Sequence, residues 1–156
     1  MTALTDLSLR DVAAKIKAKD VSPVEVTQAC LDRAAATEPK LSAFSCLLAD
    51  SALAEAKAAE AEIAAGNWRG ELHGVPVGIK ELYDVKGVPT TSSSEVRANW
   101  TATSDCASVA QLRDAGTVIL GKTHTHEFAY GIVTPKSRNP WGEDHSPGGS
   151  SGGSGA

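Results

Sequence analysis

The sequence predicts an α/β protein, and two observations lead to this class. The first half places apolar residues at helical spacing behind recognisable helix starts, over residues 8–65. The second half carries two short apolar runs, 75–80 and 117–122, on either side of a helical stretch at 104–116. A strand, a helix and a strand in that order are typical of a crossover between parallel strands. We therefore expect helices over 8–65 and an α/β region over 70–156.

Three helices are expected in the first half. The text "SLRD" at 8–11 resembles a capping box, and "SPVE" at 22–25 combines a capping serine with a proline at the first helical position. The second helix should end near Thr37, because helical backbone is disfavoured at the residue before a proline, and Glu38 precedes Pro39. A third helix is expected over 50–65, with small residues on one face. These helices are expected to provide packing surface, and no catalytic residue is predicted in them.

Composition narrows the function classes. A formal net charge of −4 and the lack of a basic stripe argue against nucleic acid as a partner. No apolar run is long enough to cross a bilayer, and the first residues do not resemble a signal peptide, so no membrane partner is expected. Three widely spaced cysteines, Cys30, Cys46 and Cys106, favour reduced thiols and a cytoplasmic location over disulfides or a zinc site.

One segment, "GTVILGKT" at 116–123, matches the pattern of a phosphate-binding P-loop. A P-loop needs a flexible loop whose amides converge on phosphate and which leads into a helix. Here the middle residues are threonine, valine, isoleucine and leucine, which favour an extended strand. The segment is therefore predicted to be a strand in which Lys122 is structural, and no nucleotide is expected to bind.

A second segment, "HTHE" at 124–127, invites a metal interpretation. On a strand, His124 and His126 would face the same side. A metal would need a third ligand, and the spacing of His73, His145 and Glu127 selects none of them. A histidine pair at a loop or at the edge of the core is the favoured interpretation, and no metal is expected.

Two features remain open on local sequence alone. Lys80 ends the apolar run "VPVGIK", where it could extend to solvent beside Glu81 or lie buried as a neutral amine that acts as a general base. The segment "SPGGSSGGSGA" at 146–156 could be a flexible linker, or a glycine loop that brings amides and serine hydroxyls to a reacting centre. A serine without a histidine partner needs another base, and a neutral lysine is suited to that role.

Three segments, in order, resemble the N-terminal part of an amidase signature enzyme. They read "GELHGVPVGIKELYDVKGVPTT", "DCASVAQLRDAGTVILGKTHTHEFAYG" and "SRNPWGEDHSPGGSSGGSGA". The resemblance implies the family's fold, a mixed β-sheet core covered by helices, of which residues 1–156 would be the N-terminal part of a single domain. It also implies hydrolysis of a small-molecule amide with no cofactor.

The resemblance assigns roles to individual residues. Lys80 falls on the family's catalytic lysine, and Ser150 on the serine that follows a cis peptide bond. In such enzymes the neutral lysine shares a proton with this serine, which relays it to a nucleophilic serine. The nucleophile forms an acyl-enzyme that water releases. Tyr130, Gly131 and Ser151 fall on substrate-side positions.

The family's nucleophile and oxyanion-hole amides lie in a further glycine-rich motif, downstream of residue 156. Residues 1–156 alone are therefore expected to be inactive and poorly stable, and to need a complementary C-terminal chain or a homo-oligomer. Two positions depart from the family's pattern. Ser93 stands where glycine is common, and His124 where asparagine is usual, which concerns the substrate side more than the reaction class.

Two alternatives remain open beside a stand-alone amidase. The first is the glutaminase component, the A subunit, of a tRNA-dependent amidotransferase, because "HEFAYG" resembles the corresponding segment of both kinds of protein. The second is an inactive truncated fragment that acts only by association with another chain.

Overall fold

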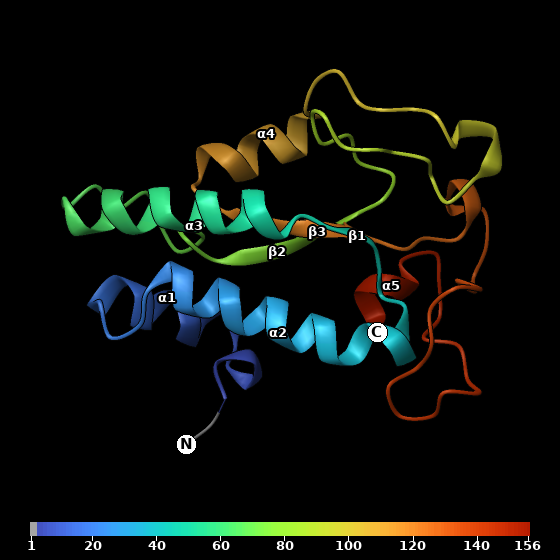
Figure 1. Ribbon diagram of the computed structural model, residues 1–156, viewed down its shortest axis with the longest axis horizontal. Coiled ribbons are helices and arrows are strands. Elements are labelled where there is room, and N and C mark those ends of the chain that lie inside the picture. Colours follow the sequence, from blue (N-terminus) through green and yellow to red (C-terminus); the bar gives the residue numbers. More distant parts are fainter. Residues whose placement is uncertain (1–2) are drawn as a thin grey trace. The chain divides into compact units, whose positions relative to one another are not determined.

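The computed structural model of the chain describes residues 3–156 (Figure 1). The helices are α1 (Leu9–Ala18), α2 (Pro23–Leu41), α3 (Ala49–Ala64), α4 (Ala107–Asp114) and the short α5 (Gly152–Gly155), and the strands are β1 (Phe44–Leu47), β2 (Pro76–Lys80) and β3 (Val118–Thr123). Single 3-10 turns lie at Leu4–Asp6, Glu95–Arg97 and Glu127–Ala129. Within residues 3–156, every helix is too short or too polar to cross a membrane.

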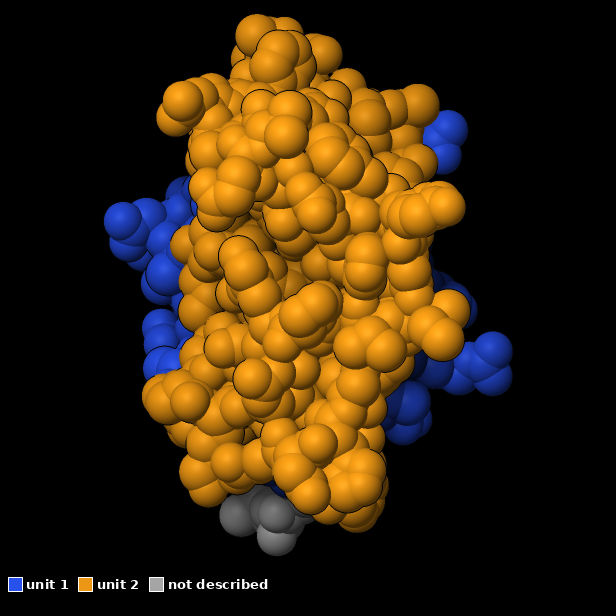
Figure 2. All heavy atoms as spheres, turned by 90° about the vertical axis from the view of Figure 1, so that its right-hand side faces the viewer, with its two compact units in different colours: residues 1–35, 48–77, 111–120 blue, residues 36–47, 78–110, 121–156 orange. Residues whose placement is uncertain are grey.

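The chain divides into two compact units, which Figure 2 colours separately. The first unit contains the residues up to Ala35 together with 48–77 and 111–120. The second unit contains 36–47, 78–110 and 121–156. Each unit is assembled from segments that are distant in the sequence, so neither could be delimited from a local change of composition.

The core of the first unit forms as the helical spacing predicts. In α1, the Ser8 hydroxyl accepts a hydrogen bond from the Asp11 amide at 3.2 Å, which confirms the predicted helix start. The predicted small-residue face of α3 is buried throughout, at Ala52, Ala56, Ala59 and Ile63. One apolar cluster unites residues of several segments: Val12, Ala13, Ile16, Val21, Val26, Ile63 and Val75.

The predicted end of the second helix is wrong. Helix α2 passes Thr37 and continues through Pro39 to Leu41. A proline this close to a helix end removes little of the hydrogen-bond ladder. The Glu38 carboxylate also braces the end of the helix, because it accepts a hydrogen bond from the Ala43 amide at 2.8 Å. A local rule for residues before proline could not include this support.

The three strands form one mixed sheet in the order β1-β3-β2. Strands β1 and β3 are antiparallel, with Phe44 opposite Thr123. The Val118 amide donates to the Val75 carbonyl, and the Glu81 amide donates to the Thr123 carbonyl. The partner residues therefore increase in number in the same direction along β2 and β3, so this pair is parallel. The α/β class and the parallel crossover through α4 are therefore confirmed.

The two predicted strands differ in burial. All six residues of β3 are buried, as expected for a central strand. Strand β2 lies at the edge of the sheet, where Gly78 is exposed and only Ile79 is fully buried. An apolar run alone therefore does not distinguish the buried central strand β3 from the edge strand β2. Strand β1 was missed, because four residues between two helices carry almost no periodic signal.

Candidate active site

Lys80 and Ser150 meet in the second unit. The Lys80 amino group at the end of β2 donates a hydrogen bond to the Ser150 hydroxyl, with 2.7 Å between Nζ and Oγ. Both side chains are half-buried, so Lys80 is less enclosed than its apolar run suggests. The peptide bond between Gly149 and Ser150 is cis, as the resemblance implies. The local alternative, a lysine that extends beside Glu81 into solvent, is not what the structure shows.

The backbone of Ser150 is held by three donors. Its carbonyl oxygen accepts hydrogen bonds from the Thr125 hydroxyl at 2.7 Å, the His126 amide at 2.9 Å and the Thr134 hydroxyl at 3.2 Å. Thr125 and Thr134 are almost completely buried. These bonds fix the carbonyl and leave the hydroxyl of Ser150 directed at Lys80. The sequence analysis missed both threonines, since an isolated threonine gives no signal of such a role.

The segment 146–156, the glycine-serine loop, is closely packed and is not a spacer. A Cβ atom at Gly149 would lie 2.6 Å from the Val133 amide nitrogen, and one at Gly152 would collide with the side chain of Thr134. A Cβ at Gly153 would collide with backbone atoms of two other segments. Glycine is therefore required here for close approach of the loop to neighbouring backbone. The interpretation as a flexible linker is wrong.

Ser93, a position where the resemblance implies glycine, adopts a left-handed conformation with φ of 54°. Its hydroxyl donates to the buried Glu81 carboxylate at 2.9 Å. The side chain thus gains a bond to a charged group in a backbone conformation that suits glycine better. This balance of two effects leads to a measurable prediction.

Ser93→Gly is expected to lower the free energy of unfolding by about 1 kcal/mol. The lost hydrogen bond to a charged group is worth about 1.5–3 kcal/mol, and relief of the left-handed backbone returns roughly 1–2 kcal/mol. Ser93→Ala loses the bond without that relief, so it should be less stable than Ser93→Gly. Urea denaturation of the three proteins measures the order. A glycine variant more stable than the wild type would show that backbone strain outweighs the hydrogen bond.

Lys122 is structural, as predicted. Segment 118–123 is strand β3, and the Lys122 side chain is fully buried within the second unit. Its ammonium donates to the Thr90 hydroxyl at 2.9 Å and approaches the Pro89 carbonyl at 3.4 Å. Burial lowers the pKa of Lys122, and the charge of Glu81 opposes that shift. A lysine enclosed in this way differs from the accessible lysine of a phosphate-binding loop.

The histidines of "HTHE" follow β3 and do not form part of it. The His124 amide bonds to the Ala43 carbonyl, and burial lowers the pKa of its ring, with Lys136 adding to the effect. The His126 ring lies against Gly131, where a Cβ atom would come within 2.5 Å of Nε2. Across residues 3–156, no three histidine, cysteine or acidic side chains gather closely enough to hold a metal ion.

The three substrate-side residues occupy different surroundings. Tyr130 is 89% exposed, and Ser151 is also exposed. Gly131 faces the His126 ring. The structure does not bring Tyr130 into the hydrogen-bond network around Ser150, so its role stays a prediction, as do those of Gly131 and Ser151.

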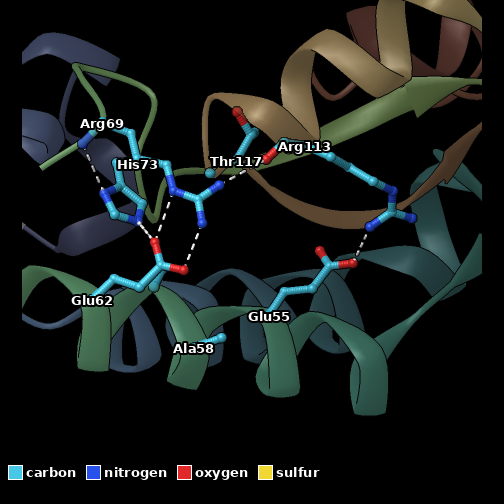
Figure 3. A pocket seen from close by; sticks show the side chains of 9 residues that line it. Glu55, Ala58, Glu62, Arg69, His73, Arg113 and Thr117 are labelled. Atoms are coloured by element: carbon cyan, nitrogen blue, oxygen red, sulfur yellow. Dashed lines mark hydrogen bonds and ion pairs between the residues drawn. The ribbon is translucent and has the colours of Figure 1, made fainter. Parts of the chain in front are cut away.

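A second cluster of charged residues lies within the first unit and lines a cleft of about 150 Å³ (Figure 3). Arg69 binds Glu62 on α3 through two nitrogen–oxygen contacts of 2.8 and 2.5 Å. His73 is fully buried, and its Nε2 lies 3.2 Å from a Glu62 oxygen. Beside them, Arg113 pairs with Glu55, also on α3. These ion pairs attach neighbouring segments to α3, which is a structural role that the sequence analysis did not identify.

This cluster predicts that stability falls in weak acid. Burial lowers the pKa of His73 below its ordinary value of 6.5, and Glu62 only partly opposes the shift. Below pH 6.5 the unfolded chain therefore binds a proton that the folded chain does not, so stability falls as the pH drops toward the folded pKa. Glu62 stays charged over this range, because its hydrogen bonds to Arg69 hold its pKa below 4.5.

His73→Gln should therefore reduce the loss of unfolding free energy between pH 7.5 and pH 5.5, measured by urea denaturation. The remaining slope is assigned to His124, whose pKa burial also lowers. His145→Gln is the control, because the His145 side chain is largely exposed. An equal pH slope in the wild type and in His73→Gln would contradict the assignment to His73.

Comparisons with known proteins show which family the chain resembles. A family model described as Amidase matches residues 25–156. An amidase from Pseudomonas putida is 57% identical over 148 residues, which cover 95% of this chain and 31% of that protein. The A subunit of the glutamyl-tRNA(Gln) amidotransferase from Thermobifida fusca (strain YX) is 46% identical over 161 residues, covering 100% of this chain and 32% of the relative.

A solved structure also has a fold similar to that of this chain. The native peptide amidase from Stenotrophomonas maltophilia superposes with a TM-score of 0.87 at 34% identity, over 96% of this chain and 33% of that one. The chain spans about a third of the length of the relatives it matches. A family match over most of the chain, close relatives and a common fold lead to one conclusion: the chain belongs to the amidase family, whose members include the amidase signature enzymes.

Proposed function

We propose that the protein containing this chain hydrolyses the amide bond of a small molecule, with Lys80 as the base and Ser150 as the proton relay. The observation that carries the proposal is the 2.7 Å hydrogen bond between Lys80 Nζ and Ser150 Oγ. A neutral lysine accepts the hydroxyl proton of Ser150, which in turn accepts the proton of a nucleophilic serine. The nucleophile attacks the amide carbonyl, the leaving nitrogen takes that proton back through the same relay and departs as the amine, and water then hydrolyses the acyl-enzyme to release the acid.

In this proposal the nucleophilic serine comes from a part of the protein outside residues 1–156. The support is the resemblance, together with the coverage of only a third of each relative. Tyr130, Gly131 and Ser151 are proposed to face the substrate, and the location is proposed to be cytoplasmic. A complementary C-terminal segment or a second copy of the chain is proposed to complete the site.

A second candidate is the glutaminase component of a tRNA-dependent amidotransferase. Its support is the 46% identity to the Thermobifida fusca amidotransferase protein over the whole chain. Such a protein would release ammonia from glutamine and work with partner subunits. The greater identity to the Pseudomonas putida amidase, 57%, favours the stand-alone amidase.

Ammonia release distinguishes these functions. The full-length protein is purified without partners and incubated with simple aliphatic and aromatic amides and with glutamine. Release from simple amides by the protein alone is the expected result. Release from glutamine alone, stimulated by partner subunits, would favour the amidotransferase, and no release from any amide would contradict hydrolysis.

A further inference from the structure

Glu81 is a buried carboxylate that the proposed mechanism does not use. It is only 3% exposed and follows Lys80 at the end of β2. It accepts four hydrogen bonds: from the amide and hydroxyl of Thr91 at 3.3 and 2.5 Å, and from the amide and hydroxyl of Ser93 at 3.2 and 2.9 Å. A buried charge of this kind persists only where donors compensate it. Glu81 therefore gathers both residues around one carboxylate.

The segment 89–94, the seryl loop, is also attached to the central strand. Lys122 in β3 donates to the Thr90 hydroxyl and approaches the Pro89 carbonyl. Two charged side chains of opposite sign, one just after β2 and one in β3, thus hold the same loop in the second unit. Charged groups that are buried and fully bonded impose a particular geometry on the segments they join.

The seryl loop in turn contacts the segment that holds Ser150. The Ser93 hydroxyl accepts a bond from the Thr125 amide at 3.4 Å, and the Ser94 hydroxyl donates to Glu127 at 2.5 Å. Thr125 then donates its own hydroxyl to the Ser150 carbonyl at 2.7 Å. A continuous series of contacts therefore leads from Glu81 through Ser93 and Thr125 to Ser150.

We propose that Glu81 is a positioning residue for the Lys80–Ser150 pair, acting through the seryl loop and Thr125. Lys80 is the last residue of β2, and Glu81 is the first residue of the turn that follows it. Lys80 contacts the Ser150 hydroxyl directly, while Glu81 is connected to the Ser150 carbonyl through Ser93 and Thr125. The expected effect on turnover rests on the proposed function, whereas the expected effect on hydrogen–deuterium exchange does not.

Glu81→Gln tests the proposal, because glutamine keeps the shape but replaces one acceptor oxygen with a donor group that faces other donors. The control is Glu95→Gln, the same change at an exposed residue just beyond the seryl loop. In hydrogen–deuterium exchange on the full-length protein, Glu81→Gln should accelerate exchange at 125–134 and 148–153 and leave α1 unchanged. Exchange equal to that of Glu95→Gln at both segments would overturn the proposal.

Turnover of a simple amide is measured on the same preparations. A displacement of the relay on the order of 1 Å reduces kcat about 10²-fold, with little change expected in KM because the Glu81 side chain is buried. A loss of active protein without a change of kcat per folded molecule would mean a merely structural role, and would overturn the proposal. A wild-type protein without amide hydrolysis would refute the proposed function instead, and the exchange data would then decide the positioning role alone.

A second pair of variants tests the same connection if Glu81→Gln fails to fold. Thr125→Val removes the hydroxyl that bonds to Ser150, and Thr125→Ser retains it. Thr125→Val should reproduce the faster exchange at 148–153 and the reduced kcat, and Thr125→Ser should restore most of both. Equal behaviour of the two variants would overturn the proposed connection through Thr125.

Discussion

Lys80→Ala is expected to abolish amide hydrolysis by the full-length protein and to leave its fold intact. The half-buried side chain at the end of an edge strand contributes little packing, whereas its amino group contacts the Ser150 hydroxyl. Residues that act as one catalytic unit each account for about 10⁴–10⁶ in kcat. The measurements are kcat for a simple amide and the thermal unfolding midpoint. Lys80→Met, which keeps the aliphatic stem, should lose as much activity.

Lys86→Ala is the matched control, because Lys86 is exposed and lies in the following loop of the same unit. It should retain the kcat of the wild type. Near-normal turnover by Lys80→Ala would show that the base has been assigned to the wrong residue. A large fall in the unfolding midpoint of Lys80→Ala would mean that the lysine has a structural role that its contacts do not indicate.

Gly153→Ala is expected to displace the glycine-serine loop and to destabilise the protein by about 1–3 kcal/mol, the range for overpacking a filled site. The added methyl would collide with the Ala43 carbonyl and the His124 amide, and backbone atoms cannot rotate away. Urea denaturation measures the stability, and amide exchange over 148–153 measures the loop.

Gly155→Ala provides the comparison. A Cβ atom there would lie 3.1 Å from the Pro147 carbonyl oxygen, which a small shift of the neighbour can accommodate. It should therefore cost less stability than Gly153→Ala. Equal stability of the two variants would show that the loop yields easily, and would contradict the close packing on which the geometry of Ser150 depends.

Local features of the fold were predictable because their causes are local. The cap at Ser8, the buried face of α3 and the strand at 118–123 each follow from residues a few positions apart. Helical spacing and β-branched runs act on neighbouring backbone, so a single segment contains the information. The predicted helix end at Thr37 was wrong, because the Glu38 carboxylate bonds to the turn that follows α2. A rule for the residue before a proline does not include this contact.

The sequence by itself determined the α/β class and the parallel crossover, and through its resemblance to a family it singled out Lys80 and Ser150 as the proposed base and relay. Only the tertiary structure decided how these two residues are held. Lys80 and Ser150 are 70 positions apart, and the Glu81, Thr125 and Thr134 contacts join separate segments of the second unit. Hydrogen bonds depend on distance and direction in space, and no periodic pattern in the sequence predicts the partner of a buried threonine or glutamate. The site is therefore recognisable from its motifs, and its geometry depends on contacts that appear only when the chain has folded.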